Sequence, residues 1–176
     1  MKALPLSDVY QFIEPGPVVL VTTSHRSRSN VMTMSWHMMV DFTPPLIACV
    51  VSQGDYSFAA LRATRACVIA IPDAKLAEKV VAIGNCSGRD TDKFEVFGLT
   101  QLPAENVEAP LIAECFVNLE CKVADTRLVN KYNLFVLEVI KAWRDTKQPA
   151  PKTIHHRGFG SFVVDGDTLQ LPSHMP

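Results

Sequence analysis

The stretch NVMTMSWHMM, Asn30–Met39, combines four of the chain's six methionines with a tryptophan, a histidine and several small polar residues. If it is extended, alternate side chains point to opposite sides. One side then carries Val31, Thr33, Ser35 and His37, and the other carries Met32, Met34, Trp36 and Met38. Composition alone favours a half-buried core strand, because methionine and tryptophan stripes usually pack in a core. The alternative is a strand whose polar side chains and free amides bind a flat ligand beside the indole.

Length and composition around this stretch indicate a globular protein. The 176 residues suit one domain over 1–176, and the content of 48% hydrophobic and 20% charged residues indicates a sizeable core. The formal net charge of -1 gives no electrostatic basis for binding nucleic acid or a membrane surface. We find no signal-peptide pattern and no apolar run long enough to span a bilayer, so we expect a cytoplasmic protein.

The five cysteines are odd in number and include no C-x-x-C pair, so neither a disulfide framework nor a zinc knuckle is expected. Cys49 and Cys67 lie in the apolar runs LIACVV and ACVIAI, where a free cysteine is usually a small core residue. Cys86 lies in a polar loop, a position that allows exposure and reactivity.

Residue patterns along the chain predict many strands and few helices. Strands are expected at 17–24, 46–52, 66–71, 114–125 and 132–143, with a hairpin over 161–171 that turns at Asp165–Gly166. Helices are expected at 6–13, 56–63, 73–85 and within 90–98, and a loop at 99–110. In 114–125, alternation predicts that Asn118 and Glu120 face away from the core. Many strands with irregular connections favour a mainly β barrel with α decorations.

Common catalytic motifs are missing from the sequence. There is no G-x-G-x-x-G after a strand, no P-loop, no H-E-x-x-H and no G-x-S-x-G. His155 and His156 are adjacent, and no Asp, Glu or Cys near them in sequence completes a metal set, so we interpret them as loop histidines and predict no metal site. Chemistry could then come from a bound cofactor that the protein positions.

Seven short motifs follow one another along the chain: PGPVVLVTT, NVMTMSW, DFTPPLI, YS before a helix, SGRDTDKF, LECKV and LFVLEV. Each is weak alone, but the ordered set is specific. It resembles the flavin reductase-like, FMN-binding split-barrel family, in particular its flavoredoxin branch, from about Gly16 to Val139. The resemblance implies a split β-barrel of Greek-key type, with FMN bound at the interface of a homodimer.

The resemblance also implies which residues contact FMN. The NVMTMSW motif assigns Asn30, Thr33, Ser35 and Trp36 to the flavin. The YS motif assigns Tyr56 and Ser57 to its phosphate, and the lysine of SGRDTDKF, Lys93, is assigned to a further flavin contact. Physical chemistry is consistent with a phosphate here, since free amides at a helix start favour an anion, and Arg89 and Lys93 stand beside Ser87 and Gly88. The alternatives are a solvated charged face for the two cations, an ordinary first helical turn at 56–57, and a turn residue at Asn30.

Two segments depart from the family pattern or match it loosely. Many relatives have a histidine before the L-F-V-G-E-V strand, whereas Tyr132 stands there in this chain and Leu137 replaces the glycine. Tyr132 could stack on a flavin or hydrogen-bond to it, and its alternative is an edge-strand tyrosine. In GFGSF, Phe159 matches a region where an aromatic residue reaches the flavin, and its alternative is core packing.

The leading functional hypothesis is an FMN-dependent oxidoreductase of the flavin reductase type, in which NAD(P)H reduces the flavin. Such a reaction needs no side-chain acid or base. An FMN-binding electron carrier or flavin-storage module without NAD(P)H activity is the first alternative, since a fold does not determine a function. A binder of haem or another planar ligand and an interaction protein without a ligand are the others.

Overall fold

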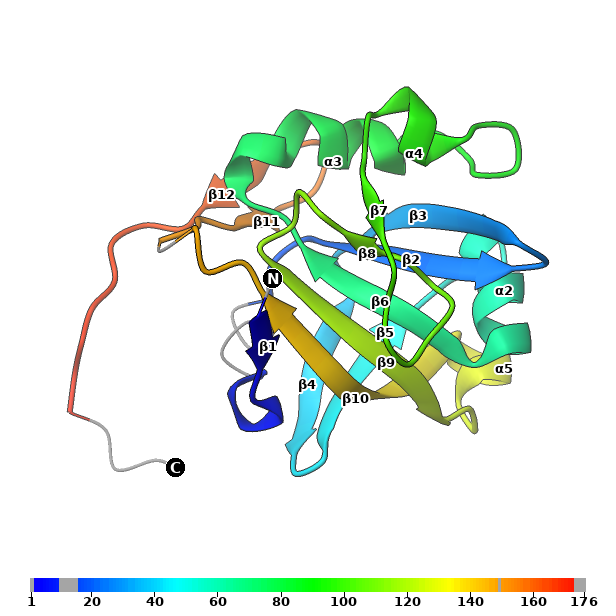
Figure 1. The fold of residues 1–176 in the computed structure, drawn as a ribbon, viewed down its shortest axis with the longest axis horizontal. Coiled ribbons are helices and arrows are strands. Elements are labelled where there is room, and N and C mark those ends of the chain that lie inside the picture. The colour runs from blue at the N-terminus through cyan, green and yellow to red at the C-terminus, as the bar shows by residue number, and fades with distance from the viewer. Residues whose placement is uncertain (1, 10–15, 149, 173–176) are drawn as a thin grey trace.

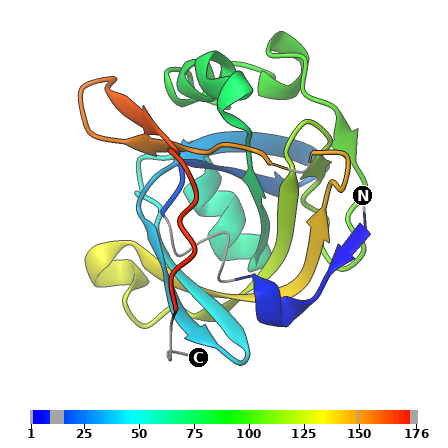
Figure 2. The same cartoon turned by 90° about the vertical axis from the view of Figure 1, so that its left-hand side faces the viewer.

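The computed structural model describes residues 2–9, 16–148 and 150–172, and its centre is an eight-stranded antiparallel sheet that curls into a barrel (Figures 1 and 2). The strands are β1 Lys2–Leu4, β2 Val19–His25, β3 Arg28–Met34, β4 His37–Phe42, β5 Pro45–Val50, β6 Ala66–Ile71, β9 Val117–Asp125 and β10 Leu134–Arg144. Their order is β3-β2-β6-β9-β10-β5-β4, and β1 pairs with the end of β10. The mainly β split barrel expected from the sequence is confirmed.

The split of the barrel lies within the stretch Asn30–Met39. Strands β3 and β4 are the two edges of the sheet, and they follow each other in the sequence. The chain therefore crosses the open side at Ser35 and Trp36, which belong to neither strand. The interpretation of one continuous strand is wrong here. Met34 packs in the core as expected, but the side chains of Trp36 and Met38 are 72% and 62% exposed.

A helix closes one end of the barrel, as the two perpendicular views show (Figures 1 and 2). This is α2, Tyr56–Thr64, whose Phe58 and Leu61 join the core inside the barrel. The ring of Phe58 meets that of Phe135 edge-on, with centroids 5.7 Å apart. Because β2 is buried on both faces, it also supports a second layer outside the barrel.

The second layer places a loop beside strand β3. Helices α3, Ala77–Gly84, and α4, Lys93–Val96, cover the outer faces of β2 and β3, where Val80, Ile83 and Phe94 pack against Leu20 and Val31. The short η2 turn, Ala74–Leu76, precedes α3, so the predicted helix 73–85 is divided. The segment between α3 and α4 passes the free edge of β3.

The remaining elements are short. They are η1 Leu6–Asp8, β7 Gln101–Leu102, β8 Leu111–Ile112, α5 Val129–Tyr132, β11 Ile154–His156 and β12 Phe162–Val164. The helix expected over 6–13 is described only as η1 at its start, and residues 10–13 lie outside the described residues. The expected loop 99–110 contains β7, which pairs with β8. None of the helices in the described ranges is long and apolar enough to cross a bilayer.

The predicted hairpin over 161–171 is wrong. Strand β12 pairs with β11, which lies before it, and the chain turns between Gly158 and Ser161 instead. Asp165 holds this hairpin: its carboxylate accepts bonds from the Thr153 hydroxyl at 2.6 Å and from His155 Nε2 at 2.8 Å. The two histidines are therefore strand residues, and an acidic group distant in sequence does contact one of them.

The prediction that Asn118 and Glu120 face away from the core does not describe their surroundings fully, because both residues are fully buried. The excursion that contains β7 and β8 folds back over this face of β9. Asn118 accepts a hydrogen bond from Ile112 N at 2.8 Å and donates one to Ile112 O at 3.1 Å.

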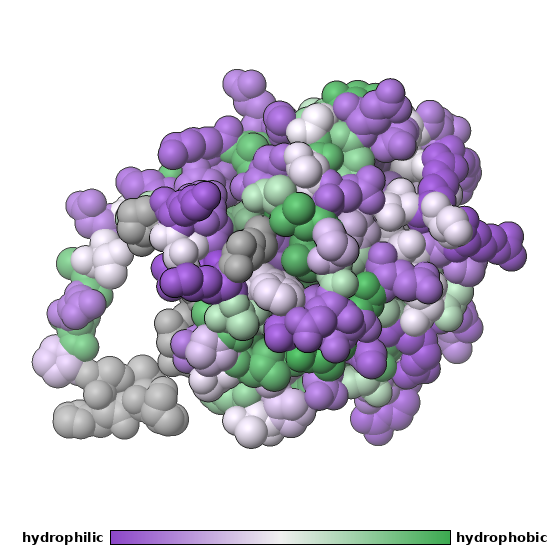
Figure 3. Space-filling model, viewed as in Figure 1, coloured by the Kyte–Doolittle hydropathy of each residue, from purple (hydrophilic) through white to green (hydrophobic). Residues whose placement is uncertain are grey.

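Cys49 and Cys67 lie in the core as expected, and Cys86 is partly exposed. On the face drawn in Figure 3, hydrophilic residues surround smaller hydrophobic patches.

Candidate functional site

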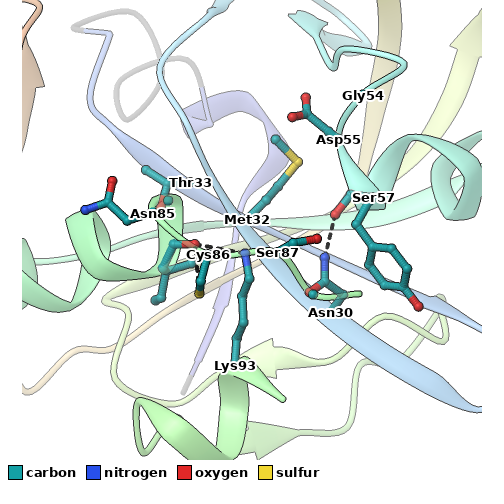
Figure 4. A pocket seen from close by; sticks show the side chains of 14 residues that line it. Asn30, Met32, Thr33, Gly54, Asp55, Ser57, Asn85, Cys86, Ser87 and Lys93 are labelled. Atoms are coloured by element: carbon teal, nitrogen blue, oxygen red, sulfur yellow. Dashed lines mark hydrogen bonds between the residues drawn. The ribbon is translucent and has the colours of Figure 1, made fainter. Parts of the chain in front are cut away.

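A cavity of about 210 Å³ lies along the free edge of β3 (Figure 4). Its walls are β3, the start of α2, and the segment from the end of α3 to the start of α4. An edge strand leaves backbone N–H and C=O groups without a neighbouring strand. The cavity therefore combines free strand edge, a helix N-terminus and a polar loop.

Asn30 fixes the start of α2 against β3. It is 5% exposed, and its Nδ2 donates to Ser57 Oγ at 2.8 Å (Figure 4). Its Oδ1 is buried and has no hydrogen-bond partner among the described residues. A buried acceptor without a donor costs about 1–3 kcal/mol, so a ligand that supplied a donor here would gain affinity.

The start of α2 has no side-chain cap, although the Phe58 amide donates to Asp55 O at 3.0 Å. The preceding residue, Asp55, makes no side-chain capping bond to the helix, and its carboxylate instead accepts from Ser52 N at 2.8 Å. Uncapped amides and the helix dipole together favour an anion at this end of the nine-residue helix.

Gly88 permits the loop to approach β3 closely. A Cβ added at this position would overlap Asn30 Oδ1 and lie 2.9 Å from Tyr56 Cδ1. Arg28 anchors the loop here: its Nη2 donates to Gly88 O at 2.7 Å, and its guanidinium lies 5.4 Å from the centre of the Tyr56 ring. Only a residue without a side chain fits between these groups.

Lys93 brings a buried cation to the cavity. Its side chain is almost fully buried, and its Nζ donates to Ile83 O at 2.8 Å. Asp92 positions it by capping α4, accepting from Phe94 N at 3.1 Å. Burial lowers the pKa of Lys93, while the nearby Cys86 and Asp55 act in the opposite direction. An ammonium with so little solvent gains from an anionic partner.

Thr33 joins β3 to α3. Its Oγ1 donates to Val80 O at 2.6 Å, and Gly84 packs against its side chain. Asn30 and Thr33 stand on opposite faces of β3, so they approach the cavity from either side of the strand edge.

Comparison with known sequences supports the expected relationship. The sequence model described as "Flavin reductase like domain" matches residues 13–162. The chain belongs to the flavin reductase-like family. Among curated proteins, it is 29% identical over 177 residues to the uncharacterised protein YddH of Escherichia coli, covering 93% of this chain and 94% of YddH.

Solved structures of this family have the same fold. An FMN-binding domain of a flavin reductases-like enzyme from Shewanella baltica is 25% identical, with a TM-score of 0.90 and 97% of each chain covered. Flavoredoxin of Desulfovibrio vulgaris is also 25% identical, with a TM-score of 0.80, 89% of this chain and 90% of flavoredoxin covered. The resemblance identified from the motifs is confirmed.

Five of the residues that the motifs assign to the cofactor line this one cavity of the family fold: Asn30, Thr33, Tyr56, Ser57 and Lys93. They come from three separate elements, β3, α2 and α4. The other five do not line it. Ser35 and Trp36 lie at the crossing between the barrel edges, and Arg89 is exposed on the loop beside Gly88.

Tyr132 and Phe159 are both far more exposed than core residues. Tyr132 ends α5 with 54% of its surface exposed and lies beneath the Lys131 ammonium. Phe159 is fully exposed at the tip of the β11–β12 hairpin, so its core-packing alternative is wrong.

Several lining residues were not anticipated from the sequence. These are Met32, Gly54, Asp55, Ile83, Gly84, Asn85 and Cys86. Gly54 and Asp55 directly precede the Y-S element, so the turn before a helix was the available signal. The end of α3 carries no comparable signal, because its contact with β3 depends on tertiary packing.

Proposed function

We propose that this cavity binds the phosphate end of FMN and that the protein is a flavin-dependent oxidoreductase. The supporting observation is the convergence of a buried Lys93 ammonium, the uncapped start of α2 and the Asn30–Ser57 pair on one cavity. These groups come from distant parts of the chain. Lys93 and the start of α2 favour an anion, and the Ser57 hydroxyl, which accepts from Asn30, can still donate to a phosphate oxygen. The alternative that Lys93 belongs to a charged face exposed to solvent conflicts with the burial of its side chain.

The size of the cavity fits part of a flavin nucleotide. Whole small-molecule sites usually occupy about 300–1,000 Å³, whereas this cavity has about 210 Å³. The phosphate and its linker would therefore occupy it. Ser35 and Trp36 continue the chain directly from β3, which makes them candidates to contact the ring system.

Bound FMN would supply reversible hydride and electron transfer. The side chains described here would hold and orient it. Lys93 and the α2 amides would neutralise the phosphate, Asn30 would fix its position relative to β3, and the exposed indole of Trp36 would shield part of the ring. We propose NAD(P)H as the reductant, because the family to which the chain belongs is that of flavin reductases.

A flavin-based electron carrier is the second candidate, and the similarity to a flavoredoxin favours it. Addition of NADH or NADPH to the FMN-loaded protein without oxygen separates the two. A reductase loses its oxidised-flavin absorbance within seconds to minutes, whereas a carrier keeps it until an artificial reductant such as dithionite is added.

Replacement of Lys93 by methionine should weaken FMN binding by about 10–100-fold. The change keeps an unbranched side chain of nearly the same length but removes a charge-assisted contact of about 1.5–3 kcal/mol. Titration of FMN fluorescence quenching measures the effect. Lys75→Met removes the same charge from an exposed position and serves as the control. Equal FMN affinity in the Lys93→Met and wild-type proteins would place the phosphate elsewhere.

We also propose that the protein is a homodimer formed through the exposed face of β4. This edge strand presents Met38 and Val40, which are 62% and 51% exposed, next to the exposed Trp36. Large apolar side chains along an edge strand usually mark an interface. A partner on this side would lie close to the residues that follow β3, where the remainder of the flavin is expected.

Introducing a charge into this face tests the dimer. Val40→Asp should shift the protein from dimer to monomer at micromolar concentration, measured by sedimentation velocity, because an interface core excludes unpaired charges. Val96→Asp, at a 63% exposed position on α4, is the matched control and should leave the dimer intact. A monomeric wild-type protein would contradict the proposal.

A further inference from the structure

A second cavity, of about 280 Å³, lies beside the first, between the end of the β2–β3 hairpin and helix α2. It shares Asn30 and Tyr56 with the FMN cavity. We propose that this groove binds the 5′-adenylate half of a dinucleotide flavin, so that the protein takes FAD in preference to FMN. The proposal rests on the proposed function, because it extends the same flavin site.

Unpartnered polar atoms line this groove. Thr23 is 1% exposed, and its Oγ1 has no hydrogen-bond partner among the described residues. Asn30 Oδ1 is also buried and has no hydrogen-bond partner among the described residues. Thr23 and Asn30 face each other in the register of β2 and β3. Buried polar groups are normally satisfied, so two of them in one groove indicate a ligand that carries hydroxyl or amino groups.

The hairpin end supplies positive charge. The two arginines Arg26 and Arg28 line the groove beside His25, and no acidic residue is among its described lining residues. Arg26 and Ser27 form the turn with φ angles of 52° and 59°, a conformation that two-residue hairpins usually give to Asn-Gly. This turn places Arg26 at the groove although both turn residues carry side chains.

Arg28 connects the two cavities. It donates to Gly88 O and to Arg89 O through Nη2 alone, so Nε and Nη1 can still donate to a phosphate. A guanidinium presents donors in a planar fork that suits phosphate oxygens. A pyrophosphate that passes from the α2 N-terminus into the groove would meet Arg28 first and Arg26 next.

The floor of the groove suits a planar base. Tyr56, Ala59 and Ala60 lie at positions i, i+3 and i+4 of α2, so they form one helix face. The two alanines leave a shallow surface beside the tyrosine ring, and aromatic rings stack on nucleobases. The two cavities together fall within the usual range of about 300–1,000 Å³ for a small-molecule site. Their shared residues favour a single ligand that spans both.

The test compares FAD and FMN binding, each followed by isothermal titration of the flavin-free protein. The wild type should bind FAD about tenfold more tightly than FMN. Arg26→Gln should remove most of this difference by weakening FAD alone, because Arg26 lines only the groove. Arg62→Gln removes an exposed arginine from the last turn of the same helix, α2, and should leave both affinities unchanged.

Titration with 5′-AMP separates failure of this proposal from failure of the FMN proposal. Saturable AMP binding that competes with FAD and is weakened by Arg26→Gln supports the adenylate groove, even if FMN alone does not bind. FMN binding without any preference for FAD overturns the inference and leaves the FMN site intact. AMP binding that does not compete with FAD identifies a site for a separate nucleotide, which also overturns it.

Discussion

Replacement of Gly88 by alanine is expected to weaken FMN binding by about 100-fold or more and to lower the free energy of unfolding by about 1–3 kcal/mol. The added methyl group would overlap Asn30 Oδ1 and press on the Tyr56 ring. The loop must then move away from β3, which breaks the Arg28 contact with Gly88 O and displaces Asn30 from Ser57. The stability cost is that of overpacking. The larger effect on binding follows because one displacement disturbs several groups of the cavity.

Gly84→Ala is the matched control for the stability part of this prediction, since Gly84 also lines the cavity. It adds the same methyl group a few residues earlier, where the nearest atom, Thr33 Cβ, is 3.4 Å away. Gly84 belongs to α3, so alanine should raise the free energy of unfolding by up to about 1 kcal/mol. Chemical denaturation should show that Gly88→Ala lowers and Gly84→Ala raises the free energy of unfolding, and an FMN titration of Gly88→Ala measures its loss of affinity. Wild-type affinity and stability in Gly88→Ala would show that the loop is not held against Asn30.

Replacement of Glu120 by alanine is expected to lower the free energy of unfolding by about 3 kcal/mol or more. Its carboxylate is fully buried and accepts three hydrogen bonds, from Glu105 N at 3.0 Å, Asn106 N at 2.6 Å and Trp143 Nε1 at 2.8 Å. Alanine leaves all three donors unsatisfied. Glu120→Gln retains one acceptor oxygen and should cost less, and Glu78→Gln, an exposed position on α3, should have little effect.

The same residue predicts a pH dependence of stability. Burial acts to raise the pKa of Glu120, but the bonds from Glu105, Trp143 and Asn106 outweigh it and hold the pKa below its ordinary value. The stabilisation is therefore complete above the unfolded-state pKa of about 4.3 and is lost as the pH falls through the lower folded pKa. The stability difference between wild type and Glu120→Gln should shrink below about pH 4. A difference that stays constant to pH 3 would contradict this.

Much of the barrel follows from local sequence. The β-branched run in β2, the apolar runs in β5 and β6 and the alternation in β9 specify strands, and the ordered motifs identify the family. Asn30, Ser57 and Lys93 could be chosen because each stands in a motif, and the structure brings them to one cavity. Local pattern was informative there because a strand edge, a helix start and a loop–helix junction each have their own residue preferences.

Other features depend on contacts between distant segments. The break at Ser35 and Trp36 exists because two barrel edges must be joined, and alternation within the stretch does not reveal it. Glu120 is buried by a loop that lies before it in sequence. Gly88 is required because β3 lies beneath it, and the chain around residue 88 gives no sign of that neighbour. The Asp165–Gly166 pair resembles a hairpin turn, but the partner strand precedes it.

The most direct measurement is a titration of the purified, flavin-free protein with FMN, followed by visible absorbance and by quenching of flavin fluorescence. We predict saturable binding of one FMN per chain with a dissociation constant of about 1 µM or tighter, and clear weakening in Lys93→Met. An unchanged flavin spectrum and undiminished fluorescence up to about 100 µM FMN would contradict the assignment of the β3-edge cavity as a flavin site.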